Sequence, residues 1–414
     1  MSRHLISQAA DAAKEQTTTL RARARLQLLA AACLMCASSA TAQSLADAGA
    51  LEATPPFAAI VFAGQSNVRL RPDQRAPAVG TLRAGATVGV TGCVPDCGAE
   101  DAWALLGTDG AVRLSTLRPV TGAETATPTP GAEQLWYGRV SGISQRIYRE
   151  PELHSPRLDR RHVPHEMAFL EDEGLRARGW LQRAEGGYVQ IKGVTFLPVS
   201  PFTGQSSPTL PLVFILKPLR ARASDPPASQ ILQRYDRVPL LGLDGSGIIT
   251  AAGTFPRGSA TVIALQQRPV GIPGGAKWVS IDLAAQTLTA YEGDKPVYAT
   301  LVSSGKRQHG HRTLPGLYRV QHKLIYSDMH GGPAEPYTVD RVPYTQYFDK
   351  SEGLHGTYWH DGFGARASHG CVNLSMADAK WLFDWSPPPL PAQWNSIDPV
   401  TAGLTTLWVL VLKS

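Results

Sequence analysis

The strongest constraint on the fold is a run of β-strand patterns that continues from residue 277 to the end of the chain. The segment "KWVSIDLAAQTLTAYEGDKPVYATLVSSG" predicts two or three strands with a turn at Gly293-Asp294, and "GLYRVQHKLIY" and "TTLWVLVLK" predict further strands. The one strong helical pattern is "SMADAKWLFDW", where Ser375 and Asp378 form a capping box. We therefore expect a mainly β C-terminal domain with one helix.

Short strands are also predicted over residues 57–120. Apolar residues alternate there with turn residues, at Val68, Leu70, Val79, Leu82, Val88 and Val90. The motifs "NVRLRP", "VGTLRAG" and "WALLGTDGAVRLSTLRPV" resemble those of a bacterial SH3 domain. This resemblance implies a small β-barrel that binds cell-wall peptide or glycan. A spacer barrel without a ligand is the alternative.

The chain of 414 residues is too long for one hydrophobic core, and its 43% hydrophobic and 18% charged residues indicate a globular protein. Residues 121–134 have the composition of a linker. Residues 135–202 predict a second, diverged SH3-like module, because Gly179-Trp180 and Gly187-Tyr188 repeat glycine and aromatic placements of the first. Residues 203–276 predict a Pro/Gly-rich connector, with part of a third small module as the alternative. No stretch predicts a stable membrane span.

The first 42 residues predict an export signal. A basic run from Arg21 to Arg25 precedes an apolar run that is too short to anchor the chain in a bilayer. Ala40 and Ala42 then occupy the A-x-A positions of a cleavage site. We therefore expect export to the bacterial periplasm. Acylation of one of the two cysteines in this segment, as in a lipoprotein, fits the sequence poorly.

Removal of the signal takes away five basic and two acidic residues, so the net charge falls from +6 to +3. This charge gives no reason to expect nucleic-acid binding. A weak positive charge suits an anionic polymer such as the cell wall.

Three cysteines remain after the signal is removed. In an oxidising compartment Cys93 and Cys97, in "CVPDC", are candidates for a small disulfide loop. Half of a zinc site fits less well, because no second pair exists. Cys371 is then the odd thiol of an exported protein, which marks it as a candidate reactive cysteine.

Cys371 lies in the stretch "HGTYWHDGFGARASHGCVN", which also holds three histidines. A thiol needs a base to become a nucleophile, and a histidine that takes the proton can return it to a leaving amine. His355 can reach the thiol through the fold, whereas His369 is constrained by the adjoining glycine turn. The backbone N–H groups at Gly370 and Cys371 are candidate oxyanion donors.

This stretch resembles the signature of the YkuD-type L,D-transpeptidase catalytic domain, which has a histidine, a spacer and Ser-His-Gly-Cys-x-Asn. The segments "WVSIDLAAQTLTAYEGDKPVYATLVSSGK", "TLPGLYRV" and "VPYTQYF" also match the family, so the resemblance covers roughly residues 277–413. It implies a β-sandwich-like fold and a periplasmic cysteine acyltransferase that needs no cofactor. Enzymes of the family cleave the bond between the L-centre of diaminopimelate and the terminal D-Ala of a peptidoglycan tetrapeptide. They transfer the acyl group to an amine of a second stem, which gives a 3→3 cross-link.

Residue by residue, the resemblance assigns the nucleophile to Cys371 and the base to His355. His369 is expected to shape and polarise the site. The carbonyl of Gly356 is expected to orient the imidazole of the base, and Gly370 to allow close backbone approach.

Ser368 and Asn373 flank the motif and are expected to hold its loop by hydrogen bonds. Asn373 stands where many members of the family carry an arginine, so Arg366 is the candidate for binding a substrate carboxylate. The candidate pocket walls, chosen by position, are Tyr344, Tyr347 and Trp359.

A metal site is an alternative interpretation of the same stretch. Its candidate ligands lack any established metal-binding spacing, so we expect no metal at His355, His360, His369 and Cys371. His360 and Asp361 are predicted to be turn residues. His309 and His311, in "KRQHGHRT", are predicted to lie in a solvated flap and not to form a ligand pair.

Two classes of function remain open. One is the enzyme, whose acyl acceptor is an amine, water as in an L,D-carboxypeptidase, or a protein lysine. The other is a cell-wall-binding protein whose catalytic domain has lapsed. The presence of Cys371, His355 and the Ser368-His369-Gly370 motif favours the enzyme. The expected partners are peptidoglycan stem peptides and, through the SH3-like module, the cell wall.

Overall fold

The computed structural model describes residues 54–62, 66–120, 134–140, 146–158, 165–220, 231–245, 247–308, 310–332 and 335–413. The predicted export signal over residues 1–42, all but one residue of the predicted linker, and His309 lie outside these ranges. No helix in the described ranges is long and apolar enough to cross a membrane.

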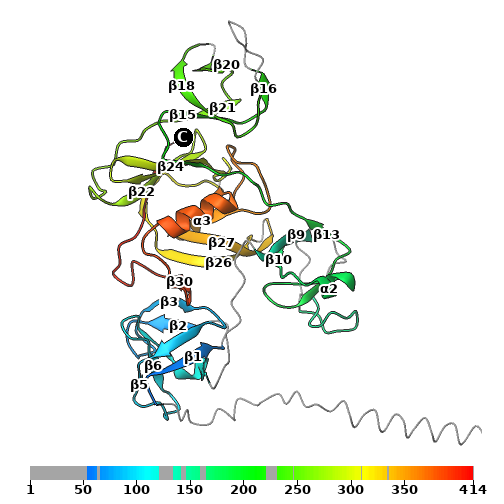
Figure 1. Ribbon diagram of the computed structural model, residues 1–414, viewed down its shortest axis with the longest axis vertical. Helices are drawn as coiled ribbons and strands as arrows, with labels where there is room; N and C mark the ends of the chain where they lie inside the picture. Colours follow the sequence, from blue (N-terminus) through cyan, green and yellow to red (C-terminus); the bar gives the residue numbers. More distant parts are fainter. Residues whose placement is uncertain are drawn as a thin grey trace, which may run out of the picture. The chain divides into compact units, whose positions relative to one another are not determined.

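The first module consists of short antiparallel strands, shown in blue and cyan in Figure 1. β4, β1 and β8 form one sheet, and β3, β2, β7, β6 and β5 are hydrogen-bonded in that order. The predicted apolar positions are buried with the exception of Leu70, which is 47% exposed. A disulfide joins Cys93 and Cys97. The strand bounds are β1 Phe57–Val61, β2 Ser66–Arg69, β3 Ala78–Leu82, β4 Thr87–Val90, β5 Gly92–Val94, β6 Trp103–Leu105, β7 Ala111–Arg113 and β8 Leu117–Pro119.

The second module is also β-rich. β9 pairs antiparallel with both β10 and β13, and β11 pairs with β12. A short helix, α2, was not predicted; the Asp172 side chain accepts a hydrogen bond from the Leu175 N–H and caps it. The bounds are β9 Trp136–Val140, β10 His165–Phe169, α2 Glu173–Ala177, β11 Trp180–Gln182, β12 Tyr188–Gln190 and β13 Val194–Phe196.

The region predicted to be a connector contains a folded sheet. Five strands follow the order β20–β19–β18–β15–β21, and Val213, Ile215 and Phe255 belong to an apolar cluster of their own. The alternative of a third small module therefore describes this region better than a connector. Its strands are β14 Gln205–Ser206, β15 Leu212–Ile215, β16 Leu219–Arg220, β17 Ile231–Leu232, β18 Arg237–Leu243, β19 Ile248–Thr250, β20 Gly253–Phe255 and β21 Ala260–Ile263.

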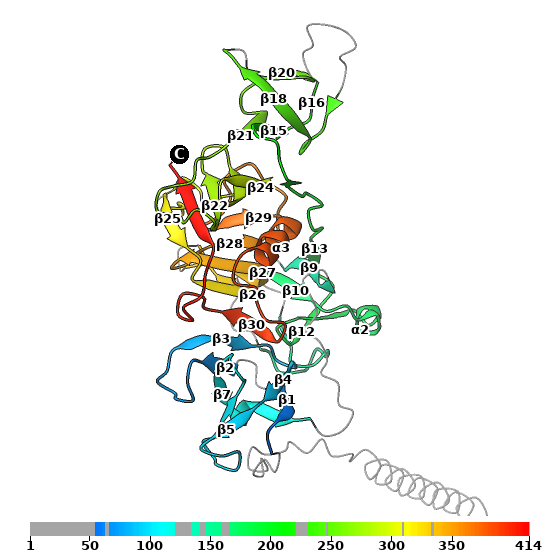
Figure 2. The same ribbon diagram turned by 60° about the vertical axis from the view of Figure 1, so that its left-hand side comes forward.

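Two groups of strands form the C-terminal domain. A six-stranded sheet has the order β14–β24–β23–β22–β31–β25, in which β31, red in Figure 2, pairs parallel with β22. β26, β27, β28 and β29 are hydrogen-bonded in sequence and build the second group. The strand bounds are β22 Lys277–Asp282, β23 Thr287–Glu292, β24 Lys295–Leu301, β25 Gly316–Arg319, β26 His322–His330, β27 Thr338–Asp349, β28 Glu352–Gly356, β29 Val372–Leu374, β30 Trp394–Ile397 and β31 Trp408–Leu412.

The predicted strands of this domain are present. The first predicted segment holds three strands, with Gly293 in a positive-φ turn between the second and third. The segment "GLYRVQHKLIY" was predicted as one strand. In the structure it forms two strands, β25 and β26, which are separated by Val320 and Gln321.

The helix α3, Met376–Trp385, packs against β27 and β28 (Figure 1). Half of the predicted capping box is present, since the Ser375 hydroxyl accepts a hydrogen bond from the Asp378 N–H at 3.1 Å. The Asp378 carboxylate instead accepts from the Tyr298 hydroxyl at 2.6 Å and from the Gly204 N–H at 2.7 Å. The residue predicted to complete the cap therefore ties the helix to β24 and to the segment before β14.

Candidate active site

Strand pairing places Cys371 beside β28. The parallel strands β28 and β29 pair Leu354 with Val372 and His355 with Asn373. Cys371 immediately precedes β29, so its neighbour in this register is Gly353, whose N–H donates a hydrogen bond to the thiol. The thiol also donates to the carbonyl oxygen of Ser351, with Sγ 3.4 Å from that oxygen.

His355 is only 1% exposed and is held in one tautomer. Its Nδ1 lies 3.0 Å from the carbonyl oxygen of Gly356, so Nδ1 carries the proton and Nε2 is the free acceptor. Burial lowers the pKa of His355 to about 4, and the imidazole is therefore neutral at physiological pH. The ring of Trp359 stacks on it at 5.8 Å between centroids.

Cys371 aligns with Gly353 in this register, two residues before His355, and no direct hydrogen bond joins Cys371 to His355 in the described part of the chain. Cys371 is half-buried, and burial raises the pKa of its thiol to about 11, with the Glu352 carboxylate contributing in the same direction. The pair is therefore a neutral thiol and a neutral imidazole in this state. Such a pair can react by general-base transfer of the thiol proton when a substrate is bound.

The Ser-His-Gly-Cys loop is fixed by its own hydrogen bonds. The Gly370 N–H donates to the Ser368 hydroxyl at 3.1 Å, and that hydroxyl donates to the carbonyl of Cys371. Thr313 supports the loop from a neighbouring segment, because its hydroxyl donates to the carbonyl of Gly370 at 2.6 Å. The Gly370 N–H, a predicted oxyanion donor, is thus engaged within the loop, and the Cys371 N–H remains the candidate donor from this motif.

The side chain of Asn373 contacts His360. The Nδ1 atom of His360 accepts from the Gly362 N–H at 3.0 Å, and its Nε2 lies 2.9 Å from the Asn373 amide. Burial lowers the pKa of His360 to about 4, so the ring is neutral and Nε2 carries its proton. This proton requires an acceptor, which assigns the amide oxygen of Asn373 to the position facing His360. His360 thus links the Gly362 backbone to the side chain of Asn373.

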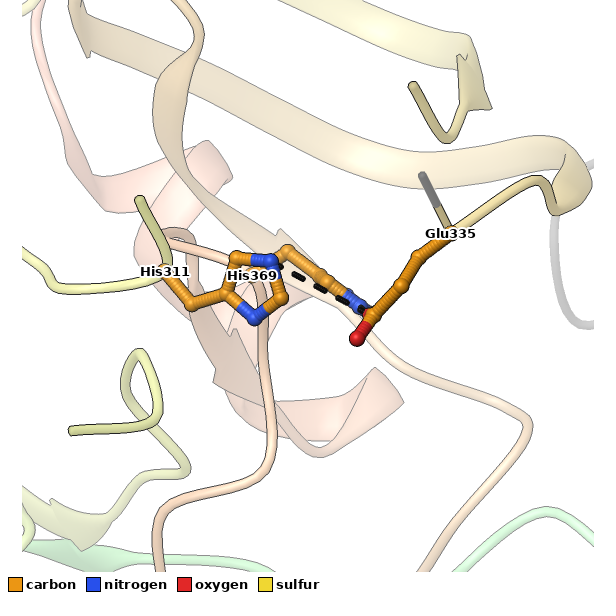
Figure 3. A group of neighbouring side chains, drawn as sticks. All are labelled: His311, Glu335 and His369. Atoms are coloured by element: carbon orange, nitrogen blue, oxygen red, sulfur yellow. Dashed lines mark hydrogen bonds and ion pairs between the residues drawn. The ribbon is translucent and has the colours of Figure 1, made fainter. Parts of the chain in front are cut away.

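His369 points to a carboxylate and not to His355. Its Nε2 lies 2.6 Å from a carboxylate oxygen of Glu335, and its ring is 4.5 Å from that of His311 (Figure 3). His311, Glu335 and His369 offer three ligand atoms within 4.8 Å of one another. Two imidazoles and a carboxylate form a donor set that suits Zn²⁺. The hydrogen bond between Glu335 and His369 already accounts for the approach of these two groups.

The predicted pocket residues separate into two groups. Tyr344 is 8% exposed and packs on Phe383 of α3, so it belongs to the core and is not a pocket wall. Tyr347 is half-buried. Burial raises the pKa of its hydroxyl, and the charge of a Cys371 thiolate would raise that pKa further, which places Tyr347 within electrostatic range of Cys371. Trp359 covers His355. Arg366 is turned toward a separate cavity lined by other arginines.

Four residues at the site were not predicted from the sequence. Ser351 immediately precedes β28, and its carbonyl accepts from the Cys371 thiol, whereas Glu352, the first residue of β28, acts on the pKa of Cys371 through the charge of its carboxylate. Glu335 comes from a loop before β27, and no sequence motif around it predicts a functional residue. Thr313 stands in "TLPGLYRV", so the match of that segment to the family was its only signal.

A family model for the L,D-transpeptidase catalytic domain, YkuD, matches residues 276–401. These residues form a YkuD-type L,D-transpeptidase catalytic domain. The predicted family is thereby confirmed for the C-terminal third of the chain, and with it the expected class of enzyme domain. The L,D-transpeptidase match contains Cys371, His355 and every other residue of the motif loop.

Two bacterial relatives are similar to part of the chain. The chain is 29% identical over 133 residues to "Probable L,D-transpeptidase YbiS" of Escherichia coli strain K12, which covers 32% of this chain and 37% of that protein. It is 26% identical over 122 residues to "Putative L,D-transpeptidase YciB" of Bacillus subtilis strain 168, covering 26% of this chain and 59% of that protein. The chain thus spans less than two thirds of either relative.

Solved L,D-transpeptidase structures resemble part of the chain. The catalytic domain of the Enterococcus faecium L,D-transpeptidase is 23% identical, with 33% of this chain and 98% of that chain covered and a TM-score of 0.26. The L,D-transpeptidase of Stackebrandtia nassauensis is 27% identical, with 36% and 59% covered and a TM-score of 0.24.

Proposed function

We propose that the protein is an exported bacterial L,D-transpeptidase that uses Cys371 to acylate itself with a peptidoglycan stem peptide. The observation that carries this proposal is the position of Cys371 at the head of β29, beside the strand that holds the buried, neutral His355. The match of residues 276–401 to the catalytic-domain family supports an acyl-transfer reaction.

In the first half-reaction, Nε2 of His355 accepts the thiol proton while Sγ of Cys371 attacks a carbonyl carbon of the substrate. That carbon belongs to the L-centre of diaminopimelate in a tetrapeptide stem. The new S–C bond gives a tetrahedral oxyanion, for which the Cys371 N–H is a candidate donor. The C–N bond to D-Ala then breaks, its nitrogen takes the proton from His355, and D-Ala leaves. A thioester on Cys371 remains.

In the second half-reaction, the side-chain amine of another stem attacks the thioester carbon. His355 accepts a proton from this amine and returns it to the sulfur as the S–C bond breaks. The product is a 3→3 cross-link, and Cys371 is again a neutral thiol. If water takes the place of the amine, the same steps release a tripeptide, and if a protein lysine does so, they anchor that protein to the wall.

Two further features fit this setting. The disulfide between Cys93 and Cys97 is typical of an oxidising compartment, in agreement with the export signal predicted over residues 1–42. We propose that the first module, residues 57–120, is an SH3-like domain that holds the enzyme on the cell wall. A protein that only binds the wall is the alternative function.

The test is to incubate the mature protein with a disaccharide-tetrapeptide and to analyse the products by mass spectrometry. Release of D-Ala together with a cross-linked dimer supports a transpeptidase, and tripeptide alone supports a carboxypeptidase. Cys371→Ala should abolish both products, with circular dichroism as the check on its fold. If the folded wild type releases no D-Ala, the wall-binding alternative replaces the enzyme.

A further inference from the structure

A cavity of about 350 Å³ lies next to the nucleophile loop and is lined by three arginines, Arg307, Arg312 and Arg366. We call it the arginine pocket. Leu283, Leu314 and Pro315 supply its apolar surface. It has no part in the acyl-transfer steps described above, and the lone-arginine role predicted for Arg366 does not account for three guanidinium groups in one cavity.

The three guanidinium groups have no carboxylate partner in the described ranges. Arg366 donates to the carbonyls of Leu283 and Gly305 at 2.7 and 3.0 Å, and Arg312 donates to the carbonyl of Arg307 at 2.9 Å. These contacts orient the groups without neutralising them. Burial and the nearby charges of Arg307 and Arg312 lower the pKa of Arg366. Like charges held together in this way repel one another and favour an anion between them.

A residue that lines the pocket is hydrogen-bonded to the reactive loop. Thr313 lines the cavity, and its hydroxyl donates to the carbonyl of Gly370, the residue before Cys371. The Gly305 N–H donates to the same hydroxyl at 2.9 Å, while the Gly305 carbonyl accepts from Arg366. One short chain of hydrogen bonds therefore connects the floor of the pocket to the backbone that positions the thiol.

We propose that the arginine pocket binds a free carboxylate of the donor stem peptide, namely the carboxylate on the second centre of its diaminopimelate. The inference rests on the proposed function. In that substrate the L-centre carboxyl is consumed in the reacting amide, whereas the other carboxylate stays free and charged on the same side chain. Guanidinium groups bind carboxylates through paired, charge-assisted hydrogen bonds. The pocket thus selects stems whose diamino acid is neither amidated nor replaced by lysine.

The experiment compares two disaccharide-tetrapeptides that differ only in this carboxylate, one free and one converted to the amide. We expect wild type to show roughly tenfold higher kcat/KM for the free carboxylate, mainly through KM, in line with the loss of one charge-assisted hydrogen-bonded contact. The double variant Arg307→Ala/Arg312→Ala should lose this preference, and Arg312→Lys should retain part of it. The control Arg75→Ala, an exposed residue of the first module, should keep the preference in full.

Direct binding separates this inference from the proposed function. Calorimetry with Cys371→Ser and each peptide measures recognition without turnover. Carboxylate-dependent binding that the double variant abolishes supports the pocket even if wild type shows no turnover. Equal binding of the two peptides, or a double variant that weakens both to the same degree, overturns the inference while leaving acyl transfer by Cys371 intact.

Discussion

The Nδ1 atom of His355 lies 3.0 Å from the carbonyl oxygen of Gly356, and this contact leaves Nε2 as the proton acceptor of the ring. The backbone of the next residue therefore sets the tautomer of His355. In a Ser-His-Asp triad, by contrast, a carboxylate sets the tautomer of the histidine. A neutral acceptor hydrogen bond holds the ring in place without raising its basicity as strongly as a charged one would.

The first prediction concerns this base. His355→Gln keeps a polar side chain of similar reach but cannot accept and return the proton, so kcat for D-Ala release should fall by about 10²- to 10⁴-fold. The measurement is D-Ala release from the tetrapeptide under saturating substrate. His154→Gln, at an exposed position of the second module, is the matched control and should leave kcat unchanged. A variant at position 355 with wild-type kcat would remove His355 from the mechanism.

The second prediction is the pH profile of thiol alkylation in the free enzyme. Burial raises the pKa of Cys371 to about 11 and lowers that of His355 to about 4, so neither group is charged between pH 6 and 9. The thiolate fraction, and with it the rate of iodoacetamide alkylation, should rise throughout this range, by about tenfold per pH unit well above pH 7 and less steeply near pH 7, where the Glu352 carboxyl becomes charged. Mass spectrometry of the Cys371 peptide gives the rate. A plateau across neutral pH would instead show a preformed thiolate–imidazolium pair.

Much of this site was predictable because it is local in sequence. Cys371, Ser368 and Asn373 lie within six residues, and their contacts follow from one glycine turn and one short strand. His355 was predictable because the family match places a histidine at that distance before the motif.

The partners of His369 were not predictable in the same way. Glu335 is 34 residues away in sequence, and His311 belongs to a third segment, so only the folded chain brings them together. The prediction of Tyr344 as a pocket wall rested on its position in the sequence alone. A φ of +56° at Tyr344 interrupts the extended backbone of β27, and the side chain is buried against α3.

The third prediction tests the charge beside the nucleophile. Burial raises the pKa of Glu352 to about 7, so this carboxyl is protonated well below pH 7 and charged well above it. When charged, it raises the pKa of Cys371. Glu352→Gln removes the charge, and alkylation at pH 8.5 should accelerate roughly threefold, as expected for one half-exposed charge near a thiol.

The two pH regimes supply the control for Glu352→Gln. At pH 5.5 the wild-type carboxyl is already neutral, so the variant and the wild type should be alkylated at equal rates. Asp384→Asn, which removes an exposed carboxylate on α3, should have no effect at either pH. An equal acceleration at pH 5.5 would mean that the substitution opened the site and did not act through charge.

The fourth prediction concerns Lys323, which is fully buried beneath the end of α3. Its Nζ donates to the carbonyls of Phe383, Ser386 and Pro388 at 2.9, 2.8 and 2.8 Å. These carbonyls lie in and just beyond the last turn of the helix, where backbone acceptors lack helical partners. Lys323→Met fills the space of the side chain but removes the amine donor from all three carbonyls, of which, in the described ranges, only that of Phe383 has a second donor, the Ser386 hydroxyl at 3.2 Å. The free energy of unfolding should fall by about 3 kcal/mol or more.

Urea denaturation followed by tryptophan fluorescence measures this loss. The matched control is Lys380→Met, because the Lys380 amine is half-exposed on the same helix, pairs with Asp384 and lies 5.6 Å from the centroid of the Tyr344 ring. That surface pair contributes at most about 0.5 kcal/mol, so the control should unfold near the wild-type midpoint. Because Lys323 acts at the far end of α3 from Ser375, the Lys323→Met variant should retain alkylation of Cys371 at the wild-type rate under folding conditions. If Lys323→Met had the same free energy of unfolding as Lys380→Met, the carbonyls at the end of α3 would not need the lysine as a hydrogen-bond donor.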